Sequence, residues 1–504
     1  MLFANGKKTQ SGFLTMEILL AMTVAVFALA GAVLVCFGGQ SLDIGTAQNS
    51  EALVLAEGMI KDRQDAAAND FRLVNSTRTQ AGIFTQKTEV STHSFFTKKI
   101  TASVSWDFGG QRQEVQLQTL ISDWRGTAGN DTCDSNLSGD WKNPQVEQVI
   151  DFSDFAESAS STYAIGDIDA YKNKLYVAME KTGTKTDATF FVFDVSDPAM
   201  PALLKKIDNN SGAMSGINAI AVDKNHAYLA SSTTKQFQII DTLQNPLKIF
   251  SYKINNGEEA LSVFYGNNYV YLGLKKIDGP EFNIINVNDI NNPVVVGSFE
   301  IGAGINDIYV KGDYAYLAHP ADLTSPSESG REQLTVLNIT NPANPYRAGG
   351  FFHEEGMGGH GKSLRVIGNR IYLGRTTSHI SGSPDEIGDF FMLSGDDIST
   401  DFIPILGQHS FSCVGSANKL IVRDNLAFVL LGTENSGGDL RILNIADPAN
   451  VVEARKNIDF PKEAGEAGEA GGRGGVAMDC EGNYLYVASV DGQGKSYLSI
   501  ITAK

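Results

Sequence analysis

The chain has 504 residues, which is too long for one ordinary domain, so at least two are expected. Its formal net charge of −18 argues against nucleic-acid binding driven by counterion release, and no nucleic-acid partner is expected. The 51 glycines and a charged fraction of only 19% are typical of a turn-rich β protein.

The chain begins with a short basic leader and an apolar segment. The leader, residues 1–12, carries Lys7 and Lys8. Residues 13–37 contain one charged side chain, Glu17, and predict a helix of about 37 Å, which is enough to span a bilayer. A carboxylate inside such a segment is costly and marks a functional residue. The alternatives are a plain signal anchor and a secretory signal peptide, although the apolar core of a secretory signal is usually shorter and carries no acid.

The sequence SGFLTMEILLAM, residues 11–22, resembles the processing site of type IV prepilins and of the related pseudopilins of type II secretion. The resemblance implies that a prepilin peptidase cleaves between Gly12 and Phe13, and that Phe13 becomes N-methylated. Glu17 would then be the fifth mature residue, whose carboxylate pairs with the amine of a neighbouring subunit. The implied partners are the peptidase and other pilin subunits. The implied locations are the inner membrane before assembly and an extracellular pilus afterwards.

Residues 38–125 predict a pilin-like α+β module. Helical character continues to about Asp70, and strands are expected over residues 82–90, 98–106 and 113–124. A long helix on a small antiparallel sheet is the pilin architecture, and residues 104–124 also resemble the sheet of minor pilins. The polar residues 126–140 predict a linker.

Residues 141–504 contain a repeated pattern of four apolar strands. The aromatic residue of the second strand recurs seven times, at positions 176, 228, 271, 316, 372, 428 and 486. This period predicts an all-β seven-bladed propeller, and the units resemble LVIVD repeats. The last unit stops after its third strand, so residues 145–152 are expected to supply the missing strand and close the ring. An open β-solenoid is the alternative.

Loop lengths differ between the two ends of the predicted blades. Turns between first and second strands, and between third and fourth strands, are short and lie on one face, the short-loop face. The other connections define the long-loop face and include most of the long loops, over residues 181–188, 320–332, 353–362, 376–388, 432–439 and 461–475. The linker enters on the short-loop face, so the pilin stem is expected there and ligands on the long-loop face.

Three cysteines follow the membrane segment, which allows one disulfide and one free thiol. Cys480 lies in the first turn of blade 7 and Cys133 precedes the strand expected to complete that blade. A Cys133–Cys480 disulfide with Cys413 free is therefore predicted, and other pairings stay open.

Imidazole and carboxylate groups gather on the predicted long-loop face. Imidazole with carboxylate suits zinc or another transition metal, so a divalent cation held by His353, Glu355 and His360 is one hypothesis; exposed polar loop residues without a metal are the other. The candidate ligand-face residues are His319, His353, Glu354, Glu355, His360, His379 and His409.

No catalytic motif is found, including GxSxG and CxxC, and the chain is not expected to be an enzyme. The leading hypothesis is a minor type IV pilin that carries a surface-exposed propeller, at the fibre tip, for adhesion or recognition of a glycan or protein. One alternative is a pseudopilin that captures export substrates. Another is a membrane-anchored exported propeller enzyme.

Overall fold

The computed structural model describes residues 46–69, 74–94, 97–108, 110–122, 132–133, 138–155, 164–179, 188–208, 216–244, 247–254, 259–321, 332–351, 359–377, 387–396, 398–400, 402–414, 416–432, 439–459, 474–490 and 495–503. The chain divides into two compact units between Asp123 and Trp124. The predicted leader and membrane segment, residues 1–37, lie outside the described residues. Within the described ranges no helix is long and apolar enough to cross a membrane.

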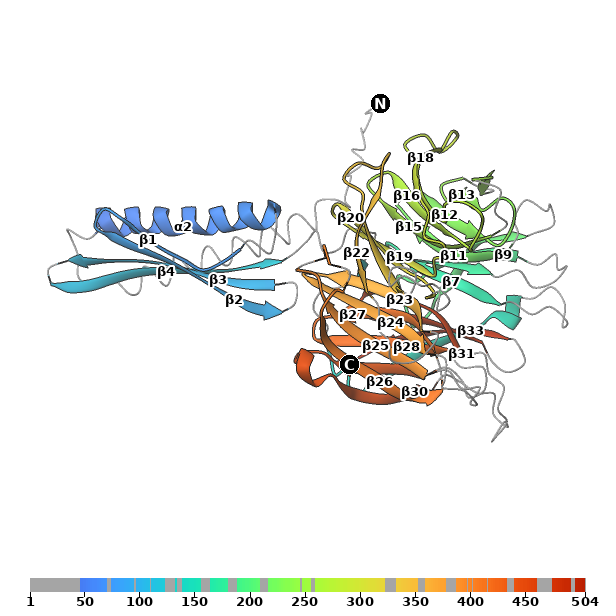
Figure 1. Cartoon of the computed structure of the whole chain (residues 1–504). Helices are drawn as coiled ribbons and strands as arrows, with labels where there is room; N and C mark the ends of the chain where they lie inside the picture. Colours follow the sequence, from blue (N-terminus) through green and yellow to red (C-terminus); the bar gives the residue numbers. More distant parts are fainter. Residues whose placement is uncertain are drawn as a thin grey trace, which may run out of the picture. The chain divides into compact units, whose positions relative to one another are not determined.

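The first unit is a helix on an antiparallel sheet. Helix α2 (Thr46–Asn69) runs along the sheet in Figure 1. The strands are consecutive neighbours: β1 (Thr77–Ala81), β2 (Phe84–Ser94), β3 (Thr97–Phe108) and β4 (Gln111–Ser122). The expectation of three strands was wrong, because β1, which has only exposed residues, forms a separate edge strand before the Gly82–Ile83 turn.

The core of this unit comes from one side of α2 and one side of the sheet. Ala52 and Ala56 are fully buried, and their small side chains allow the helix to approach the strands closely. Phe84 and Trp106 meet edge to face at 5.5 Å in the same core. Strand residues that alternate with this apolar set, such as Lys87 and Glu89, are exposed and form an ion pair.

The second unit contains seven sheets of the blade pattern. In blade order, their strands are β7 (Ile165–Ala170), β8 (Lys174–Met179), β9 (Ala188–Asp194) and β10 (Ala202–Asp208); β11 (Ile217–Val222), β12 (His226–Ser231), β13 (Phe237–Asp241) and β14 (Lys248–Tyr252); β15 (Ala260–Gly266), β16 (Tyr269–Leu274), β17 (Phe282–Asn286) and β18 (Val294–Phe299); β19 (Asp307–Lys311), β20 (Tyr314–Ala318), β21 (Leu334–Asn338) and β22 (Tyr346–Phe351); β23 (His360–Ile367), β24 (Arg370–Thr377), β25 (Ile387–Ser394) and β26 (Ile405–Val414); β27 (Ser416–Arg423), β28 (Leu426–Gly432), β29 (Asp439–Asn444) and β30 (Val452–Asp459); and β31 (Gly474–Gly482), β32 (Tyr484–Val490) and β33 (Ser496–Thr502) with β6 (Gln145–Asp151).

The ring closes through both ends of this unit. The first strand of each blade contacts the first strand of the next, and β31 contacts β7, so the seven blades form a propeller. The segment β6, within the range expected to close the ring, pairs antiparallel with β33. A short strand, β5 (Thr132–Cys133), pairs in parallel with β31, so the chain arrives beside the innermost strand of blade 7.

The closure of the ring by β6 on β33 is named the seam. Residues 138–144 stabilise the seam on the short-loop face. Trp141 is 3% exposed and packs edge to face on Phe428 at 5.1 Å. The Asn483 side chain, in the turn between β31 and β32, accepts from the Ser138 amide at 3.1 Å and donates to the Ser138 carbonyl at 3.1 Å. Gly139 has φ +85° and lies against the Ala503 carbonyl, where a Cβ atom would clash. Side chains and one glycine therefore join segments that are hundreds of residues apart.

The turns between third and fourth strands are closed by hydrogen bonds between their own side chains and backbone amides. In blade 1, the Asp194 carboxylate accepts from the Ser196 amide at 2.9 Å and the Asp197 carboxylate accepts from the Ala199 amide at 3.1 Å. The same tandem arrangement occurs in blades 3, 4 and 6, where each pair of Asp or Asn side chains is spaced by three residues. These local bonds replace the ladder bonds that end with the strand, which explains why the turns are short.

Candidate functional site

The innermost strands tie neighbouring blades together around a central channel. In blades 2 to 6, alternating Asn and Ser side chains donate to a backbone carbonyl of the next blade. These bonds are Asn218 to Ala260 at 2.7 Å, Ser262 to Ile305 at 2.8 Å, Asn306 to Gly361 at 2.7 Å, Ser363 to Ala417 at 2.8 Å and Asn418 to Gly475 at 3.2 Å. Buried polar groups of the channel wall thus have structural partners.

The channel also contains charged side chains and a cavity of about 310 Å³. Lys419 Nζ of blade 6 lies 3.0 Å from Asp167 of blade 1. Arg365 of blade 5 lies 3.7 Å from Asp307 of blade 4. The first ion pair joins blades 6 and 1, which are separated by blade 7, and the second joins the neighbouring blades 5 and 4. Both carboxylates also accept a backbone N–H from the next blade.

Burial and charge oppose one another in this network. Burial would lower the pKa of Lys419, but the Asp167 and Asp307 carboxylates outweigh it and the pKa of Lys419 is raised. Burial raises the pKa of Asp307, against the attraction of Arg365 and Lys419. About a quarter of the Lys419 side-chain surface is accessible, and this surface lines the cavity. The network therefore links strands that line the channel, and each charged side chain in it has an oppositely charged partner.

His319 was expected as an exposed ligand residue, and this expectation was wrong. It follows the end of β20 and is 3% exposed. Its Nδ1 lies 3.0 Å from the Pro320 carbonyl oxygen and its Nε2 lies 2.9 Å from Thr335 Oγ1. Burial lowers the pKa of His319 to about 4, so the ring is neutral at pH 7.

The remaining ligand-face candidates do not form one site among the described residues. His360 begins β23 and forms a bridge with Pro320, so it lies beside the His319 segment. His409 was expected in a loop, but it lies within the outer strand β26, with Nε2 3.3 Å from Glu453 of blade 6. Four other candidates lie outside the described residues: His353, Glu354, Glu355 and His379.

A buried charged pair at the base of the long-loop face was not predicted from the sequence. Arg375, 1% exposed, donates to Asp389 at 2.9 Å, and its guanidinium lies over the Phe391 ring at 4.8 Å. Ser410 donates to the second Asp389 oxygen at 2.6 Å. Arg375 and Asp389 are direct cross-strand partners in the β24–β25 hairpin, so hairpin register is the signal that could have revealed them.

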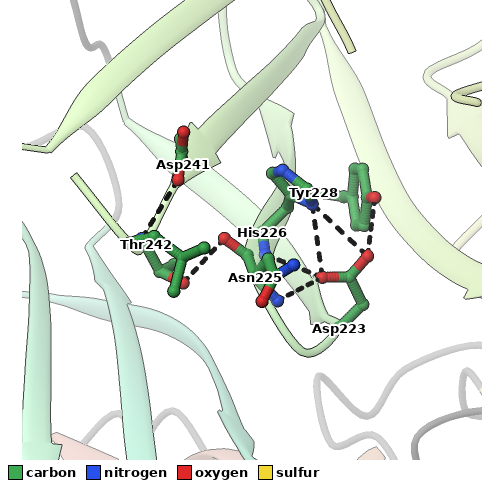
Figure 2. A network of polar contacts seen from close by, with 7 residues as sticks. Asp223, Asn225, His226, Tyr228, Asp241 and Thr242 are labelled. Atoms are coloured by element: carbon green, nitrogen blue, oxygen red, sulfur yellow. Dashed lines mark hydrogen bonds and ion pairs between the residues drawn. The ribbon is translucent and has the colours of Figure 1, made fainter. Parts of the chain in front are cut away.

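A second polar network lies at the β11–β12 turn on the short-loop face. Figure 2 shows the Asp223 carboxylate facing three neighbours. It accepts from the Asn225 and His226 amides at 2.7 Å and from the Tyr228 hydroxyl at 2.9 Å. His226 Nδ1 lies 3.4 Å from the same carboxylate, and the bond to Asp223 raises the pKa of His226. These bonds connect both sides of the β11–β12 turn, so the network stabilises that turn.

No metal centre is formed by the part of the chain that the structure describes: it contains no group of three or more His, Cys, Asp or Glu side chains placed to hold an ion. Two of the three residues of the metal hypothesis, His353 and Glu355, fall outside that part. His360, the third, is in β23.

Cys480 is disulfide-bonded and lies 1% exposed near the end of β31. The backbone of Cys133 lies opposite Gly482 in the β5–β31 pair. Cys413 was expected in a connection between blades, but its backbone belongs to the end of β26.

Comparisons with known proteins agree with the propeller architecture. The LVIVD repeat model matches residues 304–327, which include the first two strands of blade 4. No curated protein matches the chain.

Several solved structures are similar to this chain at low identity. The N-terminal domain of Nup159 is 10% identical with a TM-score of 0.43, covering 74% of this chain and 99% of that one. The β-propeller domain of the Trilobed protease from Pyrococcus furiosus is 10% identical with a TM-score of 0.42, covering 68% and 94%. An outer coat vertex of COPII on membranes is 8% identical with a TM-score of 0.41, covering 68% and 84%. The seven sheets and their contacts define the class of protein as a β-propeller, in which residues 304–327 match the LVIVD repeat model. The solved structures carry no argument about function.

Proposed function

We propose that the chain is a minor type IV pilin whose propeller is displayed at the fibre tip for adhesion or surface recognition. The observation that carries the proposal is the way the chain enters the propeller. Strand β5 pairs beside the β31–β32 turn, and Ser138 bonds to Asn483 within that turn. Both contacts belong to the short-loop face, so the strand ends at which the long loops begin lie on the face opposite to the point of attachment.

The base of the long-loop face supports a recognition role. Glu332 pairs with Arg347, Arg375 pairs with Asp389, and His319 is buried between Pro320 and Thr335. These groups hold the strand ends from which the long loops leave, so the loops start from fixed positions. A rigid scaffold that carries variable loops is the usual arrangement of a binding surface.

The pilin part of the proposal rests on Gly12, Phe13 and Glu17 and is tested on the N-terminus. We expect mass spectrometry of the mature chain to find cleavage after Gly12 and a methylated Phe13. Glu17→Ala should remove the chain from sheared fibres while leaving it in the membrane fraction. An intact leader on a fully exported chain would contradict the proposal.

Recognition is tested with fibres from cells that produce the full chain. Their binding to host-type cells and to a glycan panel is measured with and without a chelator. Replacing residues 353–358 with Gly and Ser should abolish saturable binding. If the unaltered chain also loses binding in the presence of the chelator, that result would support a divalent cation held by His353, Glu355 and His360. Lys224→Ala, an exposed change on the short-loop face, is the matched control and should bind normally. Equal binding by both variants would contradict a long-loop binding face.

The disulfide belongs to the same proposal, because it requires export to an oxidising compartment. Cys480 is bonded, and the β5–β31 pairing supports Cys133 as its partner. Proteolysis of the unreduced chain should release one peptide pair joined through Cys133 and Cys480, with Cys413 open to alkylation. A Cys413-containing pair would contradict this pairing.

A further inference from the structure

The innermost strands of the propeller share one irregularity. In six of the seven blades, the innermost strand has one residue more than the second strand opposite it, which is the pattern of a β-bulge. The extra residue, named the bulge residue, has the same place relative to the repeated aromatic residue of each second strand. The bulge residues are Gly166, Asn218, Leu261, Lys362, Asn418 and Val476. All six line the cavity in the central channel.

Some of the bulge residues join neighbouring blades. A bulge turns its side chain out of the regular alternation of a strand, and such positions recur next to functional sites. The bulge residues Asn218 and Asn418 donate to backbone carbonyls of the next blade, and Asn306 does so at the corresponding place in blade 4. In these three blades, the side chain at the bulge position therefore has a structural role.

Lys362, the bulge residue of blade 5, has no such role. The bond from blade 5 to the next blade is made by the following residue, Ser363, which donates to the Ala417 carbonyl at 2.8 Å. Lys362 is half-buried, and among the residues that the structure describes its ammonium group has no hydrogen-bond or ion-pair partner. The other cations that line the cavity, Lys419 and Arg365, are each paired with an aspartate. Lys362 is therefore a charge that a molecule in the cavity can neutralise.

The remaining carboxylates of the channel are separated from Lys362 along its length. Asp169 and Asp479 lie three residues beyond the bulge residues of their own strands, which is about 10 Å in an extended chain. Asp169 accepts from the Val222 amide at 2.8 Å and Asp479 accepts from the Ala170 amide at 2.6 Å. These two carboxylates join inner strands toward the short-loop face, whereas the bulge residues lie toward the long-loop face. An anion beside Lys362 is therefore kept apart from them.

Blade 3 gives the cavity an apolar wall. Its bulge residue is Leu261, and Val263 and Phe264 line the cavity further along the same strand. All three side chains are half-buried. The Phe264 ring packs on Tyr309 of blade 4, with 5.4 Å between the ring centroids. An apolar wall in the same cavity as one unpaired cation suits a molecule that has an anionic group on a hydrocarbon body.

We propose that the channel binds a small organic carboxylate, whose anionic group pairs with Lys362 and whose carbon skeleton packs on the apolar wall of blade 3. A carboxylate forms strong charge-assisted hydrogen bonds with an ammonium group. The cavity of about 310 Å³ lies at the lower end of the range of small-molecule sites, about 300–1,000 Å³, so the ligand is a small molecule. Such a site belongs to the propeller alone and is independent of the proposed pilin function.

Calorimetric titration of the full chain tests the site. The chain is purified in a non-ionic detergent, which supplies no anion, and is titrated with butyrate, benzoate and phenylacetate. The amides of the same three acids are the uncharged counterparts. We expect saturable binding of at least one acid, with a Kd of about 1 mM or lower, and no binding of its amide. Binding of none of the acids, or equal binding of acids and amides, would overturn the proposal.

Variants at Lys362 test the role of its charge. Lys362→Met keeps the length of the side chain without the charge and should weaken binding about tenfold or more. Lys362→Arg keeps the charge and should bind within about threefold of the unaltered chain. Lys224→Met, an exposed change on the short-loop face, is the matched control and should bind normally. The thermal unfolding midpoint should not change in any variant, because Ser363 still joins blade 5 to blade 6. Unchanged affinity of Lys362→Met would overturn the proposal.

Chemical protection gives a second readout on the unaltered chain. Lysines are acetylated with and without a saturating concentration of the acid that binds, and the modified positions are mapped by mass spectrometry. The bound carboxylate should protect Lys362, whereas Lys224 should react equally in both samples. Equal reactivity of Lys362 in both samples would contradict its place in the site, even if the acid binds elsewhere on the chain.

Discussion

The strand ends are stabilised in different ways at the short-loop face and at the long-loop face of the propeller. On the short-loop face, Asp194 and Asp197 bond to backbone amides two residues further along the chain. On the long-loop face, Arg375 bonds to Asp389 across a hairpin and His319 is enclosed between neighbouring segments. A short turn satisfies its own backbone, whereas a long loop leaves the strand ends to be fixed by buried side chains.

This difference has an energetic consequence. Turn bonds on the short-loop face are solvent-exposed, and each contributes modestly to the free energy of unfolding. A buried charged pair such as Arg375–Asp389 has a large desolvation cost, so removal of one partner is much more damaging than the pair's net contribution suggests. Single changes should therefore be most harmful at the base of the long-loop face, apart from the seam.

The seam is the exception on the short-loop face, and its removal should have the largest effect. A propeller that starts at Ala164 lacks β6 and Trp141, which leaves β33 as an open edge. We expect no cooperative unfolding transition, a loss of about 5 kcal/mol or more. A propeller that starts at Ser138 is the matched control and should unfold cooperatively. Circular dichroism on heating, with gel filtration, measures both, and equal midpoints would contradict a role for the seam.

The second largest effect is expected at Asp389. Asp389→Ala removes the carboxylate that pairs with buried Arg375 and should lower the free energy of unfolding by about 3–5 kcal/mol. Asp396→Ala is the matched control in the segment that follows β25. Asp396 is exposed, so its change should cost about 1 kcal/mol or less. Urea unfolding compares the two, and similar losses would show that burial of the pair does not decide stability.

The blade scaffold was predictable from the sequence, for a physical reason. Second strands such as β16 and β28 are apolar runs with turn residues at each end, and the repeated aromatic positions 271 and 428 lie within them as expected. Strand β1 was missed because its sequence, TRTQA, has no large apolar residue and it pairs with β2 alone.

The candidate site was much less predictable. A histidine at the end of a strand, such as His319, looks like a loop residue in the sequence, and only packing by neighbouring segments buries it. His409 stands in a polar stretch, GQHSFS, that a long bulged strand accommodates. Composition identifies polar residues, but whether they are buried depends on contacts between segments far apart in the chain.

His319 should make the long-loop face sensitive to acid. Its pKa of about 4 lies below the ordinary value near 6.5, so the unfolded chain binds a proton first as pH falls. Stability should be complete above about pH 6.5 and fall by about 3 kcal/mol as pH approaches 4. His319→Gln cannot titrate and should lose this part of the pH dependence. Urea unfolding from pH 7.5 to 4 measures both chains, and parallel curves would contradict the assignment.

The smallest effect is expected at His226 on the short-loop face, with the opposite sign. The Asp223 bond raises the pKa of His226, against partial burial, with Asp241 adding to the attraction. The stabilising contribution should be complete below about pH 6.5 and be lost as pH rises through the higher folded pKa. The side chain is partly exposed, so we expect less than about 1 kcal/mol. His226→Gln should flatten stability above pH 6.5, where His319 is neutral in both folded and unfolded chains. An NMR titration that places the pKa of His226 below its ordinary value would contradict this sign and remove the contrast between the two faces.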